Sequence, residues 1–284
     1  MNGLATVALA ILAGGSLPVA LRLGLAMTGI QFSIGALNDI VDAPRDRARP
    51  RAGSHARSIL GPGAKPLADG LVQPWTARAV TVGSAAAGLG LAALSGGWTF
   101  VIALAGAACG YAYDLRLSRT AWAWVPLAVA LPLVPAFAWT GATGALPTEL
   151  LALTPTAMLA GGGLAVGNAL ADLDADRTAG APSIALRLGR PLAWRLHAAA
   201  LGVAAALAFA VLPTDTRSGG SPVGVIVLLL GSGILAAGIG ILGGASGPGR
   251  AAAARLGWQI EAVGVAILGI GWALAFARSG SGGA

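Results

Sequence analysis

Residues 22–46 read RLGLAMTGIQFSIGALNDIVDAPRD, an apolar segment that ends in polar residues. This stretch is the most informative for the fold. Its first part is mostly apolar and has the length of about 20 residues that a helix needs to cross a bilayer. Polar side chains then follow at intervals of four: Asn38, Asp42 and Asp46. Residues four apart lie on one helix face, so the segment predicts a membrane helix that ends in a single polar stripe.

The same pattern returns at the end of a later apolar run. Asn168, Asp172 and Asp176 form this second copy, and Asp39 and Asp174 add one carboxylate to each copy. A charge within a bilayer costs about 3 kcal/mol or more and is usually functional. One such stripe alone is more typical of a helix cap, a solvated face or an ion pair. Two copies with matching asparagines favour a shared site.

The composition places the chain in a membrane. Hydrophobic residues make up 56% and charged residues 10% of the 284 residues, whereas a soluble domain has about 25% charged residues. The single cysteine excludes a disulfide framework and a cysteine-type metal cluster. The net charge of +7 does not indicate nucleic acid as a partner, because long apolar runs separate the basic residues.

Apolar runs of membrane-spanning length predict an all-α polytopic membrane protein with about nine transmembrane helices and a single domain, 1–284. The break within residues 14–18 is the weakest of those that separate the runs. The expected spans are 3–20, 22–41, 75–95, 97–115, 122–140, 150–171, 191–213, 221–243 and 252–277.

The basic residues predict the orientation. Fifteen of the 18 lysines and arginines fall in the even-numbered gaps between these runs or within a few residues of them. Because basic loops stay in the cytoplasm, we expect the N-terminus and both polar stripes on the cytoplasmic side of the cell membrane. The polar stretches after the stripes, 43–74 and 172–190, could each cap the site from that side.

Two carboxylate stripes at one membrane face suggest magnesium chemistry. Mg²⁺ takes one or two carboxylates from a protein and completes its shell with water and phosphate. Nearby basic residues would bind a diphosphate, and an apolar interior would take a hydrocarbon tail. The site therefore fits an isoprenyl diphosphate, whose metal-assisted ionisation would leave an allylic cation shielded from water.

Four segments in this order resemble the motifs of the UbiA superfamily of intramembrane prenyltransferases. They are NDIVDAPRD (38–46), KPLADG (65–70), YDLRLSRT (113–120) and DLDADRTAG (172–180). The sequence departs from the usual pattern at Asp69, where the family has a serine, and at Ser118, where it often has a lysine.

The resemblance implies nine transmembrane helices around a central cavity, capped on the cytoplasmic side, and magnesium-dependent transfer of a prenyl group to a lipophilic, usually aromatic, acceptor. By position, it implies that the metal is bound by Asp39, Asp42, Asp46, Asp172 and Asp176. The implied diphosphate ligands are Asn38, Asn168, Lys65, Arg45, Arg116 and Arg119. Tyr113 joins Asp42, Asp46, Asp172 and Asp176 as a catalytic candidate, near the reacting carbon.

Several alternatives stay open from the sequence. The same scaffold could cyclise its substrate without an acceptor, as a terpene synthase, and a cation-coupled transporter is a distant third reading. The acceptor could be a quinone precursor, a tetrapyrrole, haem, a glycerol phosphate or a sugar phosphate. Glu261, inside the last apolar run, is either a functional acid or a paired structural one.

Overall fold

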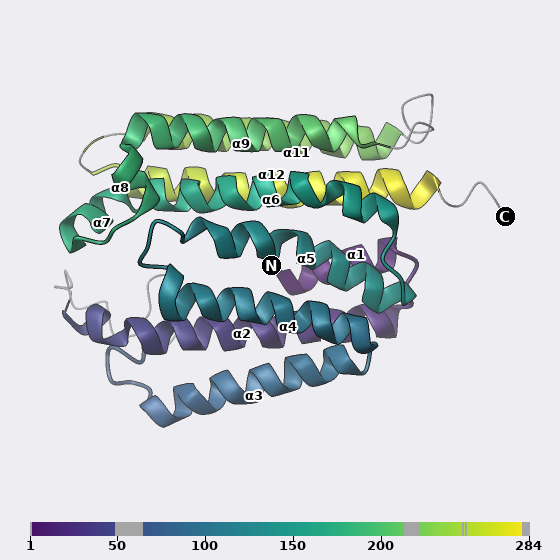
Figure 1. The fold of residues 1–284 in the computed structure, drawn as a ribbon, viewed down its shortest axis with the longest axis horizontal. Helices are drawn as coiled ribbons and strands as arrows, with labels where there is room; N and C mark the ends of the chain where they lie inside the picture. Colours follow the sequence, from purple (N-terminus) through teal and green to yellow (C-terminus); the bar gives the residue numbers. More distant parts are fainter. Residues whose placement is uncertain (1, 49–64, 213–221, 246, 248, 280–284) are drawn as a thin grey trace.

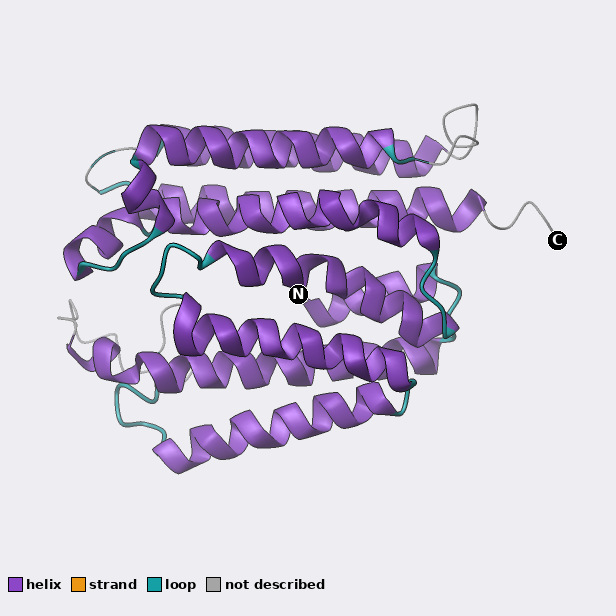
Figure 2. Cartoon of the chain, viewed as in Figure 1, coloured by secondary structure: helices purple, strands orange, loops and turns teal. Residues whose placement is uncertain are grey.

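In the computed structural model, the long helices lie side by side in one bundle (Figure 1). The structure describes residues 2–48, 65–212, 222–245, 247 and 249–279. Every regular element among them is helical, and turns and short loops join the helices (Figure 2). In chain order the elements are α1 (Asn2–Leu12), α2 (Leu17–Ala48), α3 (Pro74–Ala93), α4 (Gly97–Ala112), a π-helical turn (Tyr113–Leu117), α5 (Trp124–Thr143), α6 (Thr148–Ala171), α7 (Leu173–Ala179), α8 (Ile184–Leu188), α9 (Arg190–Ala210), α11 (Pro222–Gly244) and α12 (Ala251–Ser279).

This architecture confirms the all-α membrane fold. Seven of the described helices are long and apolar enough to cross a bilayer: α2, α4 with its π-helical turn, α5, α6, α9, α11 and α12. The helix α3 has sufficient length but lower hydropathy, and α1 has only 11 residues. These nine helices correspond to the nine apolar runs of the sequence.

The first two expected boundaries are wrong. The run expected at 3–20 is helical only to Leu12, and α2 begins at Leu17 instead of at residue 22. Gly14 has a φ of 90°, a left-handed conformation that ends α1. Pro18 then falls in the first turn of α2, where its missing N–H costs no helical hydrogen bond.

The helices alternate in direction, and this alternation gathers both polar motifs at one end of the bundle. The motif end of α2, the π-helical turn, the end of α6, α7 and α8 all lie at the left in Figure 1. The starts of α9 and α12 lie there too. Of the expected cap, residues 65–73, α7 and α8 are at this end, whereas residues 49–64 lie outside the described residues.

Glycines at seven-residue spacing bring α11 and α12 into close contact. They are Gly224, Gly231 and Gly238 on α11, and Gly257, Gly264 and Gly271 on α12. A Cβ atom on Gly264 would lie 2.8 Å from the backbone nitrogen of Leu235, so no larger side chain fits there. Small residues that let backbones approach are the usual basis of helix packing in lipid. The contact fixes the position of α12, which carries part of the site.

Candidate active site

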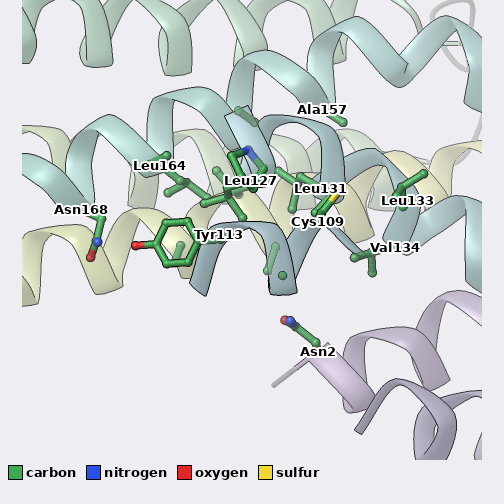
Figure 3. Close-up of a pocket in the computed structure, with 18 of the residues that line it drawn as sticks. Asn2, Cys109, Tyr113, Leu127, Leu131, Leu133, Val134, Ala157, Leu164 and Asn168 are labelled. Atoms are coloured by element: carbon green, nitrogen blue, oxygen red, sulfur yellow. The ribbon is translucent and has the colours of Figure 1, made fainter. Parts of the chain in front are cut away.

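A cavity of about 1270 Å³ opens among α2, α4, α5, α6 and α12. Most of its lining is apolar, and Figure 3 shows leucine and valine side chains of α5 around it. Tyr113 and Asn168 lie toward the polar end of this view. Phe137 and Trp272 line the cavity far from the motifs, and Trp272 stacks on Phe276 at a centroid distance of 5.3 Å. The cavity therefore joins a polar mouth to a hydrophobic interior.

The first motif lies on the last turns of α2. Asn38, Asp42 and Asp46 all line the cavity, as their spacing predicts, while Asp39 lies outside the lining. The Nδ2 group of Asn38 donates to Oδ1 of Asp114 at 3.1 Å. Asp114 is a buried residue of the π-helical turn, so this contact ties α2 to the end of α4. It also fixes the direction of the Asn38 amide.

Two cations hold the first motif. Nζ of Lys65 lies 3.1 Å from Oδ2 of Asp46 and 3.4 Å from Oδ1 of Asp39. Nη2 of Arg119 lies 3.1 Å from Oδ1 of Asp42. Burial works against the charge on Lys65, but the hydrogen bonds and negative charges of Asp46 and Asp39 outweigh it, so the pKa of Lys65 is raised above its usual value. Lys65 therefore stays cationic at neutral pH.

The loop that carries Lys65 is anchored by its own packing. Leu67 is buried against Ala43 and Ala77. The backbone N–H of Asp69 donates to the carbonyl of Lys65 at 2.9 Å, which closes a tight turn. Nη2 of Arg47 donates to the carbonyl of Leu67 at 3.4 Å. Residues from both sides of the undescribed 49–64 segment thus meet at the cavity mouth.

The second motif crosses the junction of α6 and α7. Asp172 has a φ of −96° and a ψ of 4°, so α6 ends there and the chain changes direction. The N–H of Asp172 still donates to the carbonyl of Asn168, and the N–H of Asp176 to that of Asp172. The four-residue spacing therefore survives the bend, and all three residues line the cavity. Asp174 is outside it, exposed and 3.5 Å from Arg177.

Arg255, at the start of α12, is a site residue that the sequence motifs do not reveal. Its guanidinium forms an ion pair with Asp172, and its Nη1 donates to Oδ1 of Asn168 at 3.3 Å. It lines the cavity and lies 6.0 Å from the centre of the Trp258 ring. In the sequence Arg255 is only one of many basic residues at that end. The only local feature of the sequence that sets Arg255 apart is Trp258, three residues later.

The remaining sequence candidates divide into two groups. Tyr113 and Arg45 line the cavity. Arg116 is exposed and lies outside the lining residues. Among the described residues, no three His, Cys, Asp or Glu side chains lie close enough to hold a metal ion by themselves.

Glu261 is paired. Its Oε1 lies 3.0 Å from Nε2 of His197, and Nδ1 of that ring lies 2.8 Å from the carbonyl oxygen of Gly163. Both side chains are fully buried, outside the cavity lining. The contact joins α12, α9 and α6 within the membrane-spanning part of the bundle. It supports the structural reading of Glu261.

Solved structures of other proteins share this fold. The apo structure of a UbiA homolog from Aeropyrum pernix K1 is 22% identical, covers 95% of both chains and has a TM-score of 0.70. A UbiA homolog from Archaeoglobus fulgidus, bound to DMAPP and Mg²⁺, is 16% identical, covers 93% of this chain and 94% of its own, and has a TM-score of 0.68. A structure of digeranylgeranylglyceryl phosphate synthase is 13% identical, covers 98% of this chain and 93% of its own, and has a TM-score of 0.70.

The sequence also matches a family model directly, over a region that contains both polar motifs. The model of the UbiA prenyltransferase family covers residues 2–245. No curated protein matches the chain. The family match spans most of the chain, and the structural likeness extends over the whole bundle. The chain belongs to the UbiA prenyltransferase family.

Proposed function

We propose that this protein transfers the prenyl group of an isoprenyl diphosphate to a lipophilic acceptor inside the membrane, with Mg²⁺ as cofactor. One observation carries the proposal: both Asn–Asp–Asp motifs line the mouth of one cavity whose interior is apolar. A diphosphate head and a hydrocarbon tail need these two environments in this order. The Archaeoglobus fulgidus homolog of the same fold binds DMAPP or GPP together with Mg²⁺.

The donor set fits magnesium that is shared with a substrate. No described group of carboxylates forms a closed metal site, and Mg²⁺ completes its shell with water and phosphate oxygens. Asp42 and Asp46 would hold it on one side of the mouth, and Asp172 and Asp176 on the other. When bound, the metal neutralises the diphosphate and stabilises the charge that develops on the leaving group.

The remaining residues bind and shield the substrate. Asn38, Asn168, Lys65, Arg45 and Arg119 line the cavity, where they would bind diphosphate oxygens. Asp39 acts through Lys65, which it helps to hold. The leucine- and valine-rich walls exclude water from the reacting carbon. Tyr113 lines the cavity below the mouth, where its ring can face a developing allylic cation.

Cyclisation is the second candidate. Aromatic rings line the cavity at both ends, with Tyr113, Trp124 and Trp258 toward the mouth and Phe137 and Trp272 at the far end. Such rings stabilise cations as they move along a chain. A cation-coupled transporter is disfavoured, because the acidic residues that line the cavity all belong to the two motifs at its mouth. Transfer and cyclisation differ in whether an acceptor takes part in the reaction.

The test is an assay of the purified protein in detergent with Mg²⁺ and labelled geranyl, farnesyl or geranylgeranyl diphosphate, with and without aromatic acceptors. Acceptor-dependent product supports transfer, and cyclic product without acceptor supports the synthase. We expect Asp42→Ala and Asp172→Ala to lower kcat by at least about a hundredfold, since metal assistance supplies several kcal/mol.

Asp174→Ala is the matched control, because Asp174 lies in the same acidic segment but is exposed and outside the cavity. Its activity should equal that of the wild type. All variants should purify as folded protein. Full activity of Asp42→Ala or Asp172→Ala would refute the metal assignment.

We also propose that the mouth of the cavity faces the cytoplasm at the cell membrane. Fifteen of the 18 basic residues fall in or next to the even-numbered gaps of the sequence, which include the gaps after both motifs, and basic loops are retained on the cytoplasmic side.

A further inference from the structure

Arg255 differs from the other cations at the mouth in what it touches. Lys65 and Arg119 contact carboxylates of the first motif. Arg255 contacts the second motif, and it binds the carboxylate of Asp172 and the amide oxygen of Asn168 together. Both oxygen atoms belong to side chains that the proposed function assigns to the metal–diphosphate unit. A guanidinium therefore lies where the proposed function places the metal–diphosphate unit.

The surroundings of Arg255 contact its guanidinium but leave much of the side chain accessible. The Arg255 side chain is 44% exposed at the cavity mouth. Its guanidinium lies over the ring of Trp258. That ring is fixed in turn, because its Nε1 donates to the carbonyl of Leu164 at 2.9 Å. A guanidinium has five donors in a planar fork that matches phosphate oxygens as well as carboxylates.

The backbone of α12 is fixed relative to α6. Glu261, less than two turns beyond Arg255 along α12, makes a buried contact with His197, whose ring in turn contacts the carbonyl of Gly163 on α6. The close packing on α11 begins at Gly257, two residues after Arg255. A change of partner by Arg255 therefore requires only movement of the side chain. The diphosphate would lie within the same mouth.

We infer that Arg255 is an exchangeable placeholder: it neutralises Asp172 while the site is empty of metal, and it becomes a diphosphate ligand when Mg²⁺ takes Asp172. This inference rests on the proposed function and extends it to the order of events at the second motif. The Asp172 carboxylate exchanges the guanidinium for the metal as its partner. The guanidinium then binds the diphosphate that arrives with the metal. No covalent bond changes.

The inference predicts effects of opposite sign for Arg255→Ala. Without its competing cation, Asp172 should bind free Mg²⁺ about fivefold more tightly, the size expected for an exposed ion pair. Inorganic diphosphate in the presence of Mg²⁺ should bind about ten- to a hundredfold more weakly, because a hydrogen-bonded charge is lost. Isothermal titration calorimetry of the purified protein in detergent measures both affinities without turnover. Arg255→Lys, which keeps the charge but not the planar fork, should fall between the wild type and Arg255→Ala.

Arg177→Ala is the control. Arg177 also pairs with an aspartate of the second segment, but both side chains are 67% exposed and outside the cavity. It should leave both affinities unchanged. Opposite shifts in Arg255→Ala support the placeholder, and any other combination overturns it, since a merely structural role would weaken both ligands. Wild-type protein that fails to bind diphosphate with Mg²⁺ would instead refute the proposed function itself.

Discussion

Each carboxylate at the cavity mouth has its own degree of exposure and its own partner. The Asp46 side chain is 11% exposed and held by Lys65, whereas that of Asp42 is 29% exposed and held by Arg119. Asp176 lines the cavity and makes no ion pair with a described residue. Among the described residues, the mouth thus combines carboxylates that are paired with a cation and one, Asp176, that is not. An incoming cation should meet Asp176 first.

Tyr113 separates two possible roles, that of its ring and that of its hydroxyl group. If the ring face stabilises an allylic cation, Tyr113→Phe should keep most of the wild-type kcat. Tyr113→Ala should lose about thirtyfold, the equivalent of about 2 kcal/mol for a desolvated cation–π contact. Steady-state kinetics with geranyl diphosphate measure both variants. Equal losses in the two would assign the effect to the hydroxyl.

The local part of the site could be predicted from the sequence, and its long-range part could not. The four-residue spacing correctly placed Asn38, Asp42 and Asp46 on one face, because helix periodicity depends only on neighbours. The contact of Asn38 with Asp114 spans 76 residues, and that of Asn168 with Arg255 spans 87. Such pairs depend on how helices pack, which no local spacing reveals.

At the level of the helices, the many glycines of the apolar runs favour close packing but do not show which helices meet. The seven-residue repeat pairs α11 with α12, so that Gly264 faces Leu235 and Gly231 faces Leu268. The boundary between α1 and α2 was misplaced for a similar reason. Gly14 and Pro18 are compatible with either break point, and only the left-handed conformation of Gly14 decides it.

Gly264→Ala should destabilise the fold. Its Cβ would lie 2.8 to 3.0 Å from the backbone and Cβ atoms of Leu235, and overpacking of this kind costs about 1–3 kcal/mol. Gly240→Ala on the partner helix is the matched control, because nothing lies within 4 Å of its added Cβ. The midpoint of thermal unfolding in detergent should fall only for Gly264→Ala. Similar midpoints for both variants would contradict the close contact.

For the whole molecule, the alternation of the helices places the polar motifs and most basic residues at one end. The number of apolar runs and their charge asymmetry were enough to predict this arrangement. The shape of the cavity was not predictable, because residues from ten separate helices, α1, α2, α4, α5, α6, α7, α8, α9, α11 and α12, contribute to its wall.

The orientation can be tested with two exposed positions in a Cys109→Ala background. Arg177 lies at the motif end and Ala145, between α5 and α6, at the opposite end. In sealed right-side-out vesicles, a membrane-impermeant maleimide should label Ala145→Cys at once and Arg177→Cys only after permeabilisation. The reverse pattern would place the cavity mouth outside the cell.

The aromatic stack of Trp272 and Phe276 bears on the length of the substrate tail that the cavity can hold. Trp272 follows Arg255 on α12 by 17 residues, which is about 25 Å along a helix axis. A tail anchored by its diphosphate at the mouth would meet the ring of Trp272, which lines the cavity and stacks on Phe276, once it extends over about that length. A residue far from the bond that breaks would then influence which isoprenoid length fits. Chain length and chemistry can therefore diverge separately as such a protein evolves.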